Sequence, residues 1–423
     1  MTSGRTSYAL LWILLGVLCF SSMVFYTFRI WSANQPENFS DLYARWWGAH
    51  ELFLHGRNPY SPEVSHEIQK VIYGEALIPS ADDPMGIGGG FAYPPYTAFL
   101  LWPTIYTSFG TAEKIFLFLS IALTLASMAL WLWAWRISIS PWQWIAFALF
   151  AFGSFPVLQG LKLLNLSVIA AGLITLAMAL LYAEYPVWAG IVLAVSAFKP
   201  QFVVLLVPWL ALWSCADLKR RWRFALSFVA TMLLLILGSE ILLPSGLADF
   251  LAVARAYQHY TYGHSLLDVW FTPKFAPLAC AATVLATMKV TWRSLAAPAN
   301  TAGFVGAISL LLTTTVLVIP TMEPHAQLLL LPGLIFLAQS YSSTGGSRSI
   351  GRLLLAGTGA MLVWPWIAAL GLMAALFWVP IASLLRFWEV PLYTSPLLPL
   401  AVFLALAYLL PHMAVDKPAI PPS

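Results

Sequence analysis

The amino-acid sequence predicts an all-α integral membrane protein, a polytopic bundle of about 12 transmembrane helices formed by residues 1–423 as one domain. Of the 423 residues, 60% are hydrophobic and only 9% are charged, and the mean hydropathy is +0.81. Soluble domains carry about 25% charged residues, so this composition excludes one. A helix needs roughly 20 apolar residues to cross a bilayer, and apolar stretches of about that length recur along almost the whole chain. The 20 Trp and 16 Tyr residues fit aromatic belts at the two membrane surfaces.

Twelve apolar stretches are candidate spans. They cover residues 8–30, 92–109, 112–136, 142–160, 164–184, 186–213, 224–243, 266–289, 301–319, 325–340, 353–377 and 394–411. The first is long enough to span, and no clear small-residue cleavage site follows it, so we expect it to be retained. The sixth contains Lys199-Pro200 near its middle. It can form either one kinked helix or two half-helices.

Basic clusters predict the orientation of these spans. They lie between spans six and seven and between spans ten and eleven, and comprise Lys219, Arg220, Arg221, Arg223, Arg348 and Arg352. Cytoplasmic loops are enriched in Lys and Arg, so both termini are predicted to be cytoplasmic in a multi-pass protein of the cell membrane. Residues 31–91, 244–265 and 378–393 then form the long outer segments. By the same count, Asn165-Leu166-Ser167 lies at an inner boundary.

The cysteines and the charge limit the possible partners. Cys19, Cys215 and Cys280 are isolated, with no metal-type spacing, which argues against a disulfide framework or a zinc site. The net charge of +4 is small for a chain of this length. We expect the lipid bilayer as a partner, and no nucleic acid, metal or cofactor.

The stretch Ser40 to Tyr60 in the first outer segment is predicted to contain an amphipathic helix over residues 40–55. Its apolar stripe comprises Leu42, Trp46, Ala49 and Phe53, whereas Asp41 and Arg45 share another face. Ser40 suits the N-cap and Gly56 the stop. Such a helix would lie in the outer interface with its Trp pair at headgroup level. Asp41 is either a catalytic base or a carboxylate that complements the helix dipole and pairs with Arg45.

Three further segments are candidates for a site, each with a structural alternative. Tyr93-Pro94-Pro95 opens the second span rigidly and could also form one wall of the site. Lys199 lies near the middle of an apolar span, where a charge usually faces a cavity or a partner. It could bind an anion such as a lipid phosphate, or pair with backbone carbonyls. His325, in the outer turn Glu323-Pro324-His325, could donate to a phosphate or serve as a polar anchor.

Taken in order, these pieces resemble glycosyltransferase family 87 of the GT-C superfamily, whose members use polyprenyl-phosphate sugars. The resemblance covers most of the chain. It rests on Asp41, Tyr43, Ala49, Gly56, Asn58, Pro59 and Tyr60, on Phe91 to Pro95, on Lys199-Pro200-Gln201, and on His325 with Leu328 to Pro332. One departure is Leu164-Asn165-Leu166-Ser167, where the family often has Gly-Gln-x-Asn.

The resemblance implies a GT-C fold and an inverting hexosyltransferase, with mannose as the first choice of sugar. The donor would be a polyprenyl-phosphate-linked sugar, and the acceptor a glycan or glycolipid hydroxyl on the extracytoplasmic side. Asp41 would be the catalytic base. His325, Lys199 and Arg45 would stabilise the phosphate, with Tyr60 and Tyr93 also in the substrate site. The alternatives are a polytopic transporter or lipid flippase, a polyprenyl-dependent ligase or polymerase, and an assembly subunit.

Overall fold

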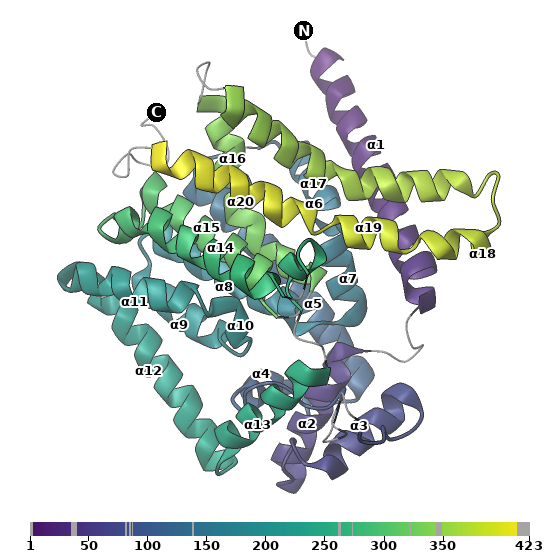
Figure 1. Cartoon of the computed structure of the whole chain (residues 1–423), viewed down its shortest axis with the longest axis vertical. Coiled ribbons are helices and arrows are strands. Elements are labelled where there is room, and N and C mark those ends of the chain that lie inside the picture. The colour runs from purple at the N-terminus through teal and green to yellow at the C-terminus, as the bar shows by residue number, and fades with distance from the viewer. Residues whose placement is uncertain are drawn as a thin grey trace.

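The computed structural model describes residues 3–34, 40–80, 83, 86, 88–137, 139–260, 264–272, 274–320, 323–343 and 349–412. These residues form helices joined by short turns, and no β-strand occurs among them (Figure 1). The prediction of an all-α protein is therefore confirmed. The main buried core joins residues from Leu42 to Leu409.

The α-helices vary widely in length. They are α1 (Ser3–Phe25), α2 (Asp41–His55), α3 (Pro62–Tyr73), α4 (Thr97–Leu101), α5 (Phe109–Ala134), α6 (Pro141–Phe152), α7 (Phe155–Leu163), α8 (Leu166–Tyr182), α9 (Pro186–Ser196), α10 (Pro200–Val203), α11 (Leu206–Ala216), α12 (Leu218–Leu242), α13 (Gly246–Tyr260), α14 (Ala276–Thr291), α15 (Ala302–Val318), α16 (Leu331–Ser343), α17 (Ser349–Ala375), α18 (Ile381–Leu384), α19 (Glu389–Thr394) and α20 (Leu397–Leu409). A π-helical turn, η1 (Tyr26–Trp31), extends α1, and the 3₁₀ segments η5 (Trp292–Leu295) and η6 (Pro324–Leu330) precede α15 and α16.

Several helices are long and apolar enough to cross a membrane. Among the described residues, five segments qualify, namely Ala9–Trp31, Phe109–Ala134, Leu218–Leu242, Ile350–Ala375 and Ile381–His412. The pair α6 and α7, bent by 65°, makes a sixth if it is one span. Only 6% of the apolar window of α12 is buried, so most of its apolar side chains are exposed or half-buried. An exposed surface this apolar requires lipid around it, which supports a multi-pass membrane protein.

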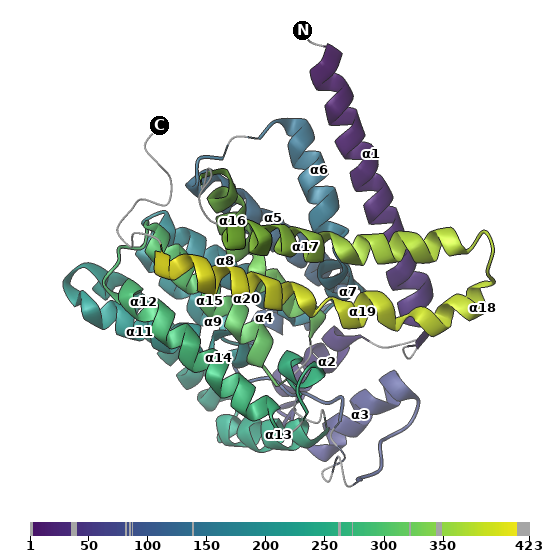
Figure 2. The same ribbon diagram turned by 45° about the horizontal axis from the view of Figure 1, so that its top comes forward.

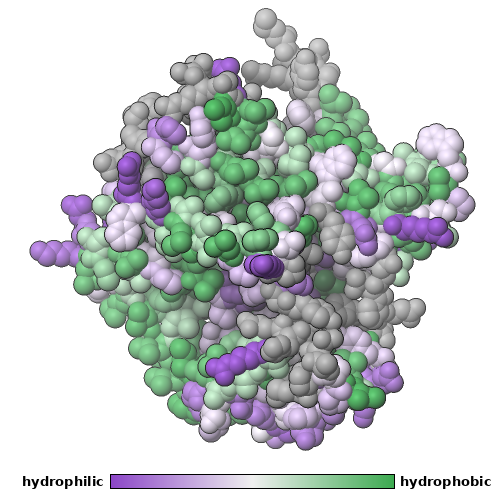
Figure 3. Space-filling view, viewed as in Figure 1, coloured by the Kyte–Doolittle hydropathy of each residue, from purple (hydrophilic) through white to green (hydrophobic). Residues whose placement is uncertain are grey.

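The helices α2, α3 and α13 lie together at one end of the molecule. Figures 1 and 2 both place them at the lower end, and Figure 1 places the start of α1 and the end of α20 in the upper part, on opposite sides. Figure 3 shows hydrophobic surface over much of the bundle, with hydrophilic residues more frequent at the lower end. The predicted outer segment thus forms a cap over one end of the helices.

The predicted span at residues 92–109 does not exist as one helix. This stretch contains α4, which has five residues, and the 3₁₀ turn Trp102–Thr104. Pro94, Pro95 and Pro103 interrupt it, because proline cannot donate to the helical hydrogen-bond ladder. Counting this stretch as a crossing is wrong, and it shifts the predicted sides of the residues that follow.

The prediction that Asn165 and Asp41 lie on opposite sides of the membrane is accordingly wrong. Asn165 was expected at an inner boundary and Asp41 outside, yet the two side chains are hydrogen-bonded to each other. The stretch 186–213, for which two forms were possible, consists of separate helices. Here α9 ends at Ser196 and α10 begins at Pro200, with Lys199 at its N-cap.

The helix predicted over residues 40–55 is present as α2. Ser40 occupies the N-cap position but makes no capping bond with its side chain in the described structure, and Gly56 ends the helix at φ +63°. Trp46 was expected at headgroup level and is instead 6% exposed, with Nε1 donating to the Thr104 carbonyl at 3.2 Å. Gly48 allows this packing, since a Cβ there would lie 2.5 Å from the Phe91 ring. This close packing fixes the position of Asp41, the first residue of α2.

Candidate functional site

The first part of the site is the meeting of two helix N-termini. Asp41 begins α2, and Asn165 is the N-cap of α8. The Asn165 Nδ2 donates to Asp41 Oδ2 at 2.5 Å, while Asn165 Oδ1 accepts from the Ser167 backbone N–H at 2.8 Å. The positive ends of both helices favour an anion between them, which suits an ionised carboxylate. Asp41 is half-buried, so its carboxylate is held but accessible.

The second part of the site is a buried ion pair. Lys199 Nζ lies 2.5 Å from Glu323 Oε2, and the side chains are 3% and 19% exposed. Ser167 Oγ accepts from Lys199 Nζ and donates to Glu323 Oε2 at 2.9 Å. Lys199 therefore has a carboxylate partner in this chain, and the predicted pairing with backbone carbonyls is not what satisfies it.

Asn165 joins the two parts. Its Oδ1 lies 3.5 Å from Lys199 Nζ, while its Nδ2 donates to Asp41. The result is a continuous polar network from Asp41 through Asn165 to Lys199 and Glu323. Residues that are up to 282 positions apart in the chain (41 to 323) thus meet at one point.

His325 lies at the far end of this network. Its Nε2 is 3.0 Å from Glu323 Oε2, and its Nδ1 is buried without a hydrogen-bond partner among the described residues. Gly160 of α7 makes room for it, because a Cβ on Gly160 would lie 3.2 Å from the His325 Cβ. A buried polar nitrogen with no partner is uncommon in folded proteins, so it is a candidate contact for a ligand.

The charge on Glu323 is set by its neighbours. Burial alone would raise the pKa of this carboxyl, but the positive charge of Lys199 and the hydrogen bond from His325 outweigh it and hold the pKa below its usual range. Glu323 is therefore ionised at neutral pH. A carboxylate only accepts hydrogen bonds, so His325 Nε2 carries the hydrogen that faces it.

Tyr93 lies between two cations. Its ring centroid is 4.9 Å from the Arg45 guanidinium carbon and 5.9 Å from Lys199 Nζ. Tyr60 lies behind it and donates its hydroxyl to the Tyr93 carbonyl at 2.6 Å. The structure therefore brings Arg45, Lys199 and Tyr93 together, whereas the Tyr60 hydroxyl hydrogen is already used to fix the Tyr93 backbone.

A small cavity adjoins the site, and a larger one lies next to it. The smaller, about 190 Å³, is lined by Pro324, which lies between Glu323 and His325, and by Gln159. The buried Gln159 Oε1 also lacks a partner among the described residues. The larger has a volume of about 320 Å³ and an almost wholly apolar lining, including Met128, Phe155, Trp366 and Leu398. Gln327 and Ser395 line both cavities, so the apolar cavity is a neighbour of the one beside the polar network.

Sequence reasoning missed three members of this network. They are Asn165, Ser167 and Glu323. In the sequence, Asn165 and Ser167 belong only to an expected inner boundary that departs from the family pattern. Their burial, 8% and 0% exposed, and their contacts indicate a different role. Glu323 was visible in the turn that contains His325, but only the histidine was considered. A carboxylate two residues from a candidate histidine is the signal that could have identified it.

Comparison with known proteins identifies the family. The sequence profile described as "Glycosyltransferase family 87" matches residues 91–320, which is more than half of the 423 residues. The matched range includes Tyr93, Asn165 and Lys199, whereas Asp41 and His325 lie outside it. Searches of curated proteins and of solved structures gave no match. This chain belongs to glycosyltransferase family 87.

Proposed function

We propose that this glycosyltransferase moves a hexose, with mannose as the first choice, from a polyprenyl-phosphate donor to a hydroxyl of a glycan or glycolipid. The single observation that carries the proposal is the polar network that links Asp41 to His325, next to a cavity that Pro324 lines. Family membership favours a transferase over the transporter or flippase that composition alone allows. The GT-C fold, the donor class, inversion and the residue roles below are parts of the proposal.

Asp41 acts as the general base. It removes the proton of the acceptor hydroxyl as that oxygen attacks the anomeric carbon of the donor sugar. The bond from that carbon to the phosphate oxygen breaks, and the polyprenyl phosphate leaves from the opposite face, so the configuration inverts. Two features of Asp41 support this role. Its side chain is half-buried, and the Asn165 amide holds one carboxylate oxygen and leaves the other for the proton.

His325 and Lys199 stabilise the phosphate, which gains negative charge as it leaves. Neutral His325, with the hydrogen on Nε2, presents Nδ1 as an acceptor, and only the imidazolium donates from both nitrogens. A phosphate at Nδ1 favours the imidazolium, whose charge Glu323 also balances at 3.0 Å. Lys199 adds a second positive charge, while Arg45 and Tyr93 complete the substrate site.

The apolar cavity suits the donor lipid. Isoprenoid units have no polar groups, and the 320 Å³ space is lined by aromatic and aliphatic side chains. The neighbouring cavity, which shares Gln327 and Ser395 and is lined by Pro324, would place a lipid-linked phosphate close to His325. A water-soluble sugar nucleotide would gain nothing from such a lining, so the cavity favours a lipid-linked donor.

The test uses purified full-length protein with a panel of polyprenyl-phosphate sugars and candidate glycolipid acceptors, read by mass spectrometry. We expect the wild type to transfer or hydrolyse at least one sugar. Asp41→Asn should reduce transfer by at least about 1,000-fold while leaving expression and melting temperature unchanged, because only the proton acceptor is lost. Near-normal turnover of Asp41→Asn would remove Asp41 as the base. Failure of every lipid-linked donor, with turnover of a sugar nucleotide, would overturn the donor class.

A further inference from the structure

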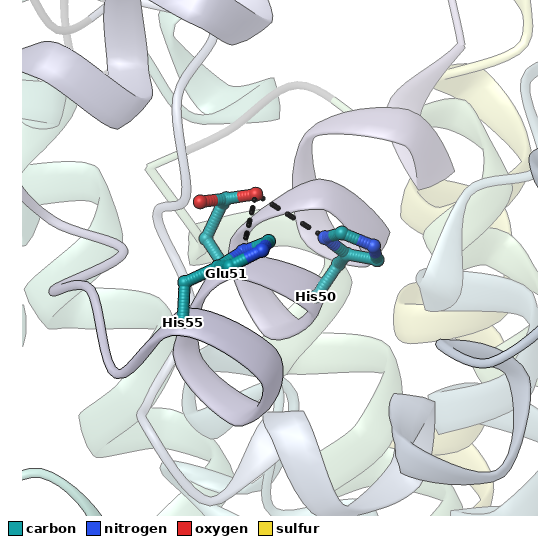
Figure 4. Close-up of side chains that lie close together, drawn as sticks. All are labelled: His50, Glu51 and His55. Carbon is teal, nitrogen blue, oxygen red and sulfur yellow. Dashed lines mark hydrogen bonds and ion pairs between the residues drawn. The ribbon is translucent and has the colours of Figure 1, made fainter.

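We propose that His50, Glu51 and His55 bind a divalent metal ion of the zinc type at the C-terminal end of α2. Figure 4 shows both imidazole rings near the Glu51 carboxylate, with a dashed line from one and the same carboxylate oxygen to each ring. This site is separate from the polar network of Asp41. Cysteine spacing gave no indication of it, because none of its ligands is a cysteine.

The ligand atoms have suitable separations. His50 Nδ1 and His55 Nδ1 each lie 3.2 Å from the same oxygen, Glu51 Oε1, and the three ligand atoms all lie within 4.8 Å of one another. Zinc bonds to imidazole nitrogen and carboxylate oxygen are about 2.0–2.2 Å, so tetrahedral ligands lie roughly 3.3–3.5 Å apart. Two sides of the required triangle are thus already close to that spacing. His55, whose side chain is 54% exposed, can turn to adjust the third.

The charge around the site favours a cation. Glu51 is 3% exposed, and its second oxygen, Oε2, accepts from Arg57 at 2.8 Å, which leaves Oε1 to the histidines. Arg57 is shared with Glu67 at 2.7 Å, so two carboxylates face one arginine and one negative charge remains when the histidines are neutral. The last turn of α2 adds the negative end of its helix dipole. A divalent ion balances this arrangement.

The predicted role of the ion is structural. His50 lies nine residues beyond Asp41, which is roughly 14 Å along a helix, so the ion does not reach the reacting atoms. It would instead hold the end of α2, to which Arg57 and Glu67 connect α3. The ordinary alternative is two histidines that simply hydrogen-bond a buried carboxylate, and the experiment separates the two.

The experiment uses full-length protein in detergent, stripped with a chelator and carrying Cys215→Ser to remove an exposed thiol. Zn²⁺ is titrated by calorimetry, and melting temperature is followed with and without Zn²⁺. We expect one Zn²⁺ per chain and a higher melting temperature with the ion. Co²⁺ should give the visible absorption of a tetrahedral site. His55→Ala should weaken Zn²⁺ binding by at least about 100-fold, since even indirect ligand support contributes about 10- to 100-fold.

The controls keep the outcome clear. His412→Ala removes an exposed histidine from the other end of the chain and should leave Zn²⁺ binding unchanged. His55→Ala and His50→Ala are each compared with their own metal-free form, so a change in folding is seen separately from a loss of binding. Absence of Zn²⁺ binding by the wild type, or equal binding by the His50→Ala/His55→Ala protein, would overturn the site. Transferase activity does not enter the readout, so either proposal can fail alone.

Discussion

Lys199 and Arg221 are both buried cations in an apolar bundle, and the chain accommodates them in opposite ways. Arg221 of α12 donates to four backbone carbonyls, those of Trp213, Leu295 at 2.8 Å, Ala296 at 2.9 Å and Ala297 at 3.0 Å. Its guanidinium also lies 4.0 Å from the Trp213 ring centroid. Lys199 instead contacts side chains, namely Glu323, Ser167 and Asn165.

This difference in partners distinguishes a cation with a fixed structural role from a cation whose partners a ligand can replace. Carbonyl oxygens neither titrate nor move without the backbone, so Arg221 ties α11 and α12 to η5 permanently. Carboxylate, hydroxyl and amide side chains can rotate or change protonation, so the partners of Lys199 can be replaced by a ligand. We therefore expect changes at Arg221 to affect stability and changes at Lys199 to affect transfer.

Between the two buried cations, the largest effect on transfer should come from neutralising the Lys199–Glu323 ion pair as a unit. Lys199→Met with Glu323→Gln should reduce transfer by about 1,000-fold, the upper part of the range for losing one preorganised electrostatic group. Folding should be nearly unaffected, because replacing both members of a buried pair leaves no unpaired charge. The measurement is turnover at saturating donor beside the melting temperature.

The single variant Lys199→Met is the matched control. It leaves Glu323 without its main partner, so it should lower stability by about 3 kcal/mol, at the low end for a broken buried pair because Glu323 is 19% exposed. Transfer by the double variant at the wild-type rate would show that Lys199 is structural like Arg221, and the contrast between the two cations would disappear.

Arg221→Met should give the reverse pattern. Four carbonyls lose a charged donor, and we expect a loss of stability of about 3 kcal/mol, roughly the value of one or two hydrogen bonds to a charged group. The fraction that remains folded should turn over at the wild-type rate. Exposed Arg223 on the same helix provides the control, since Arg223→Met should change neither property. A lower rate per folded molecule would connect this end of the bundle to catalysis.

Substitution of His325 tests whether the polar network contacts the leaving phosphate. His325→Ala should lower kcat/KM by about 100-fold, because one donor to the developing charge is lost. If the contact forms mainly in the transition state, kcat falls with little change in KM, and if it also binds the ground state, KM rises. His325→Gln, which can still donate, should recover part of the rate. An unchanged kcat and KM for His325→Ala would remove it from the site.

The sequence predicted an all-α protein with several long helices, and it contained half of the candidate site, for clear physical reasons. Hydrophobicity adds over a window, so long stretches such as α5 and α17 were recognisable without tertiary contacts. The span predicted at residues 92–109 was wrong, because prolines interrupt an apolar stretch whose length would otherwise suffice to cross a membrane. Arg221 counted as a loop charge although it is 7% exposed, because composition cannot distinguish a solvated arginine from one held by carbonyls.

The missing half of the site consists of residues whose type is ordinary at their position. Asn165 is a helix N-cap, a place where Asn is common, so its identity alone carries no information about chemistry. Only the meeting of α2 with α8 gives it a second bond, to Asp41. Asp41, Lys199 and His325 were identified because each is unusual in its own surroundings. Glu323, the common partner of Lys199 and His325, was not identified, because its importance depends on a contact with Lys199 across 124 residues.

The smallest effect should come from Asn165, the residue that joins the base to the exchangeable cation. Asn165→Ala removes the donor that holds Asp41 Oδ2, and we expect a loss of kcat of about 10-fold, within the range for a group that positions a functional residue. Asn165→Asp should be worse than Asn165→Ala, since an ionised carboxylate cannot donate to Asp41 and sets a second negative charge beside it. The measurement is kcat per folded molecule beside the melting temperature. A merely structural role would lower the folded fraction of both variants but leave kcat per folded molecule unchanged. An unchanged kcat in both variants would show that Asp41 works without Asn165, and that base and ion pair function independently.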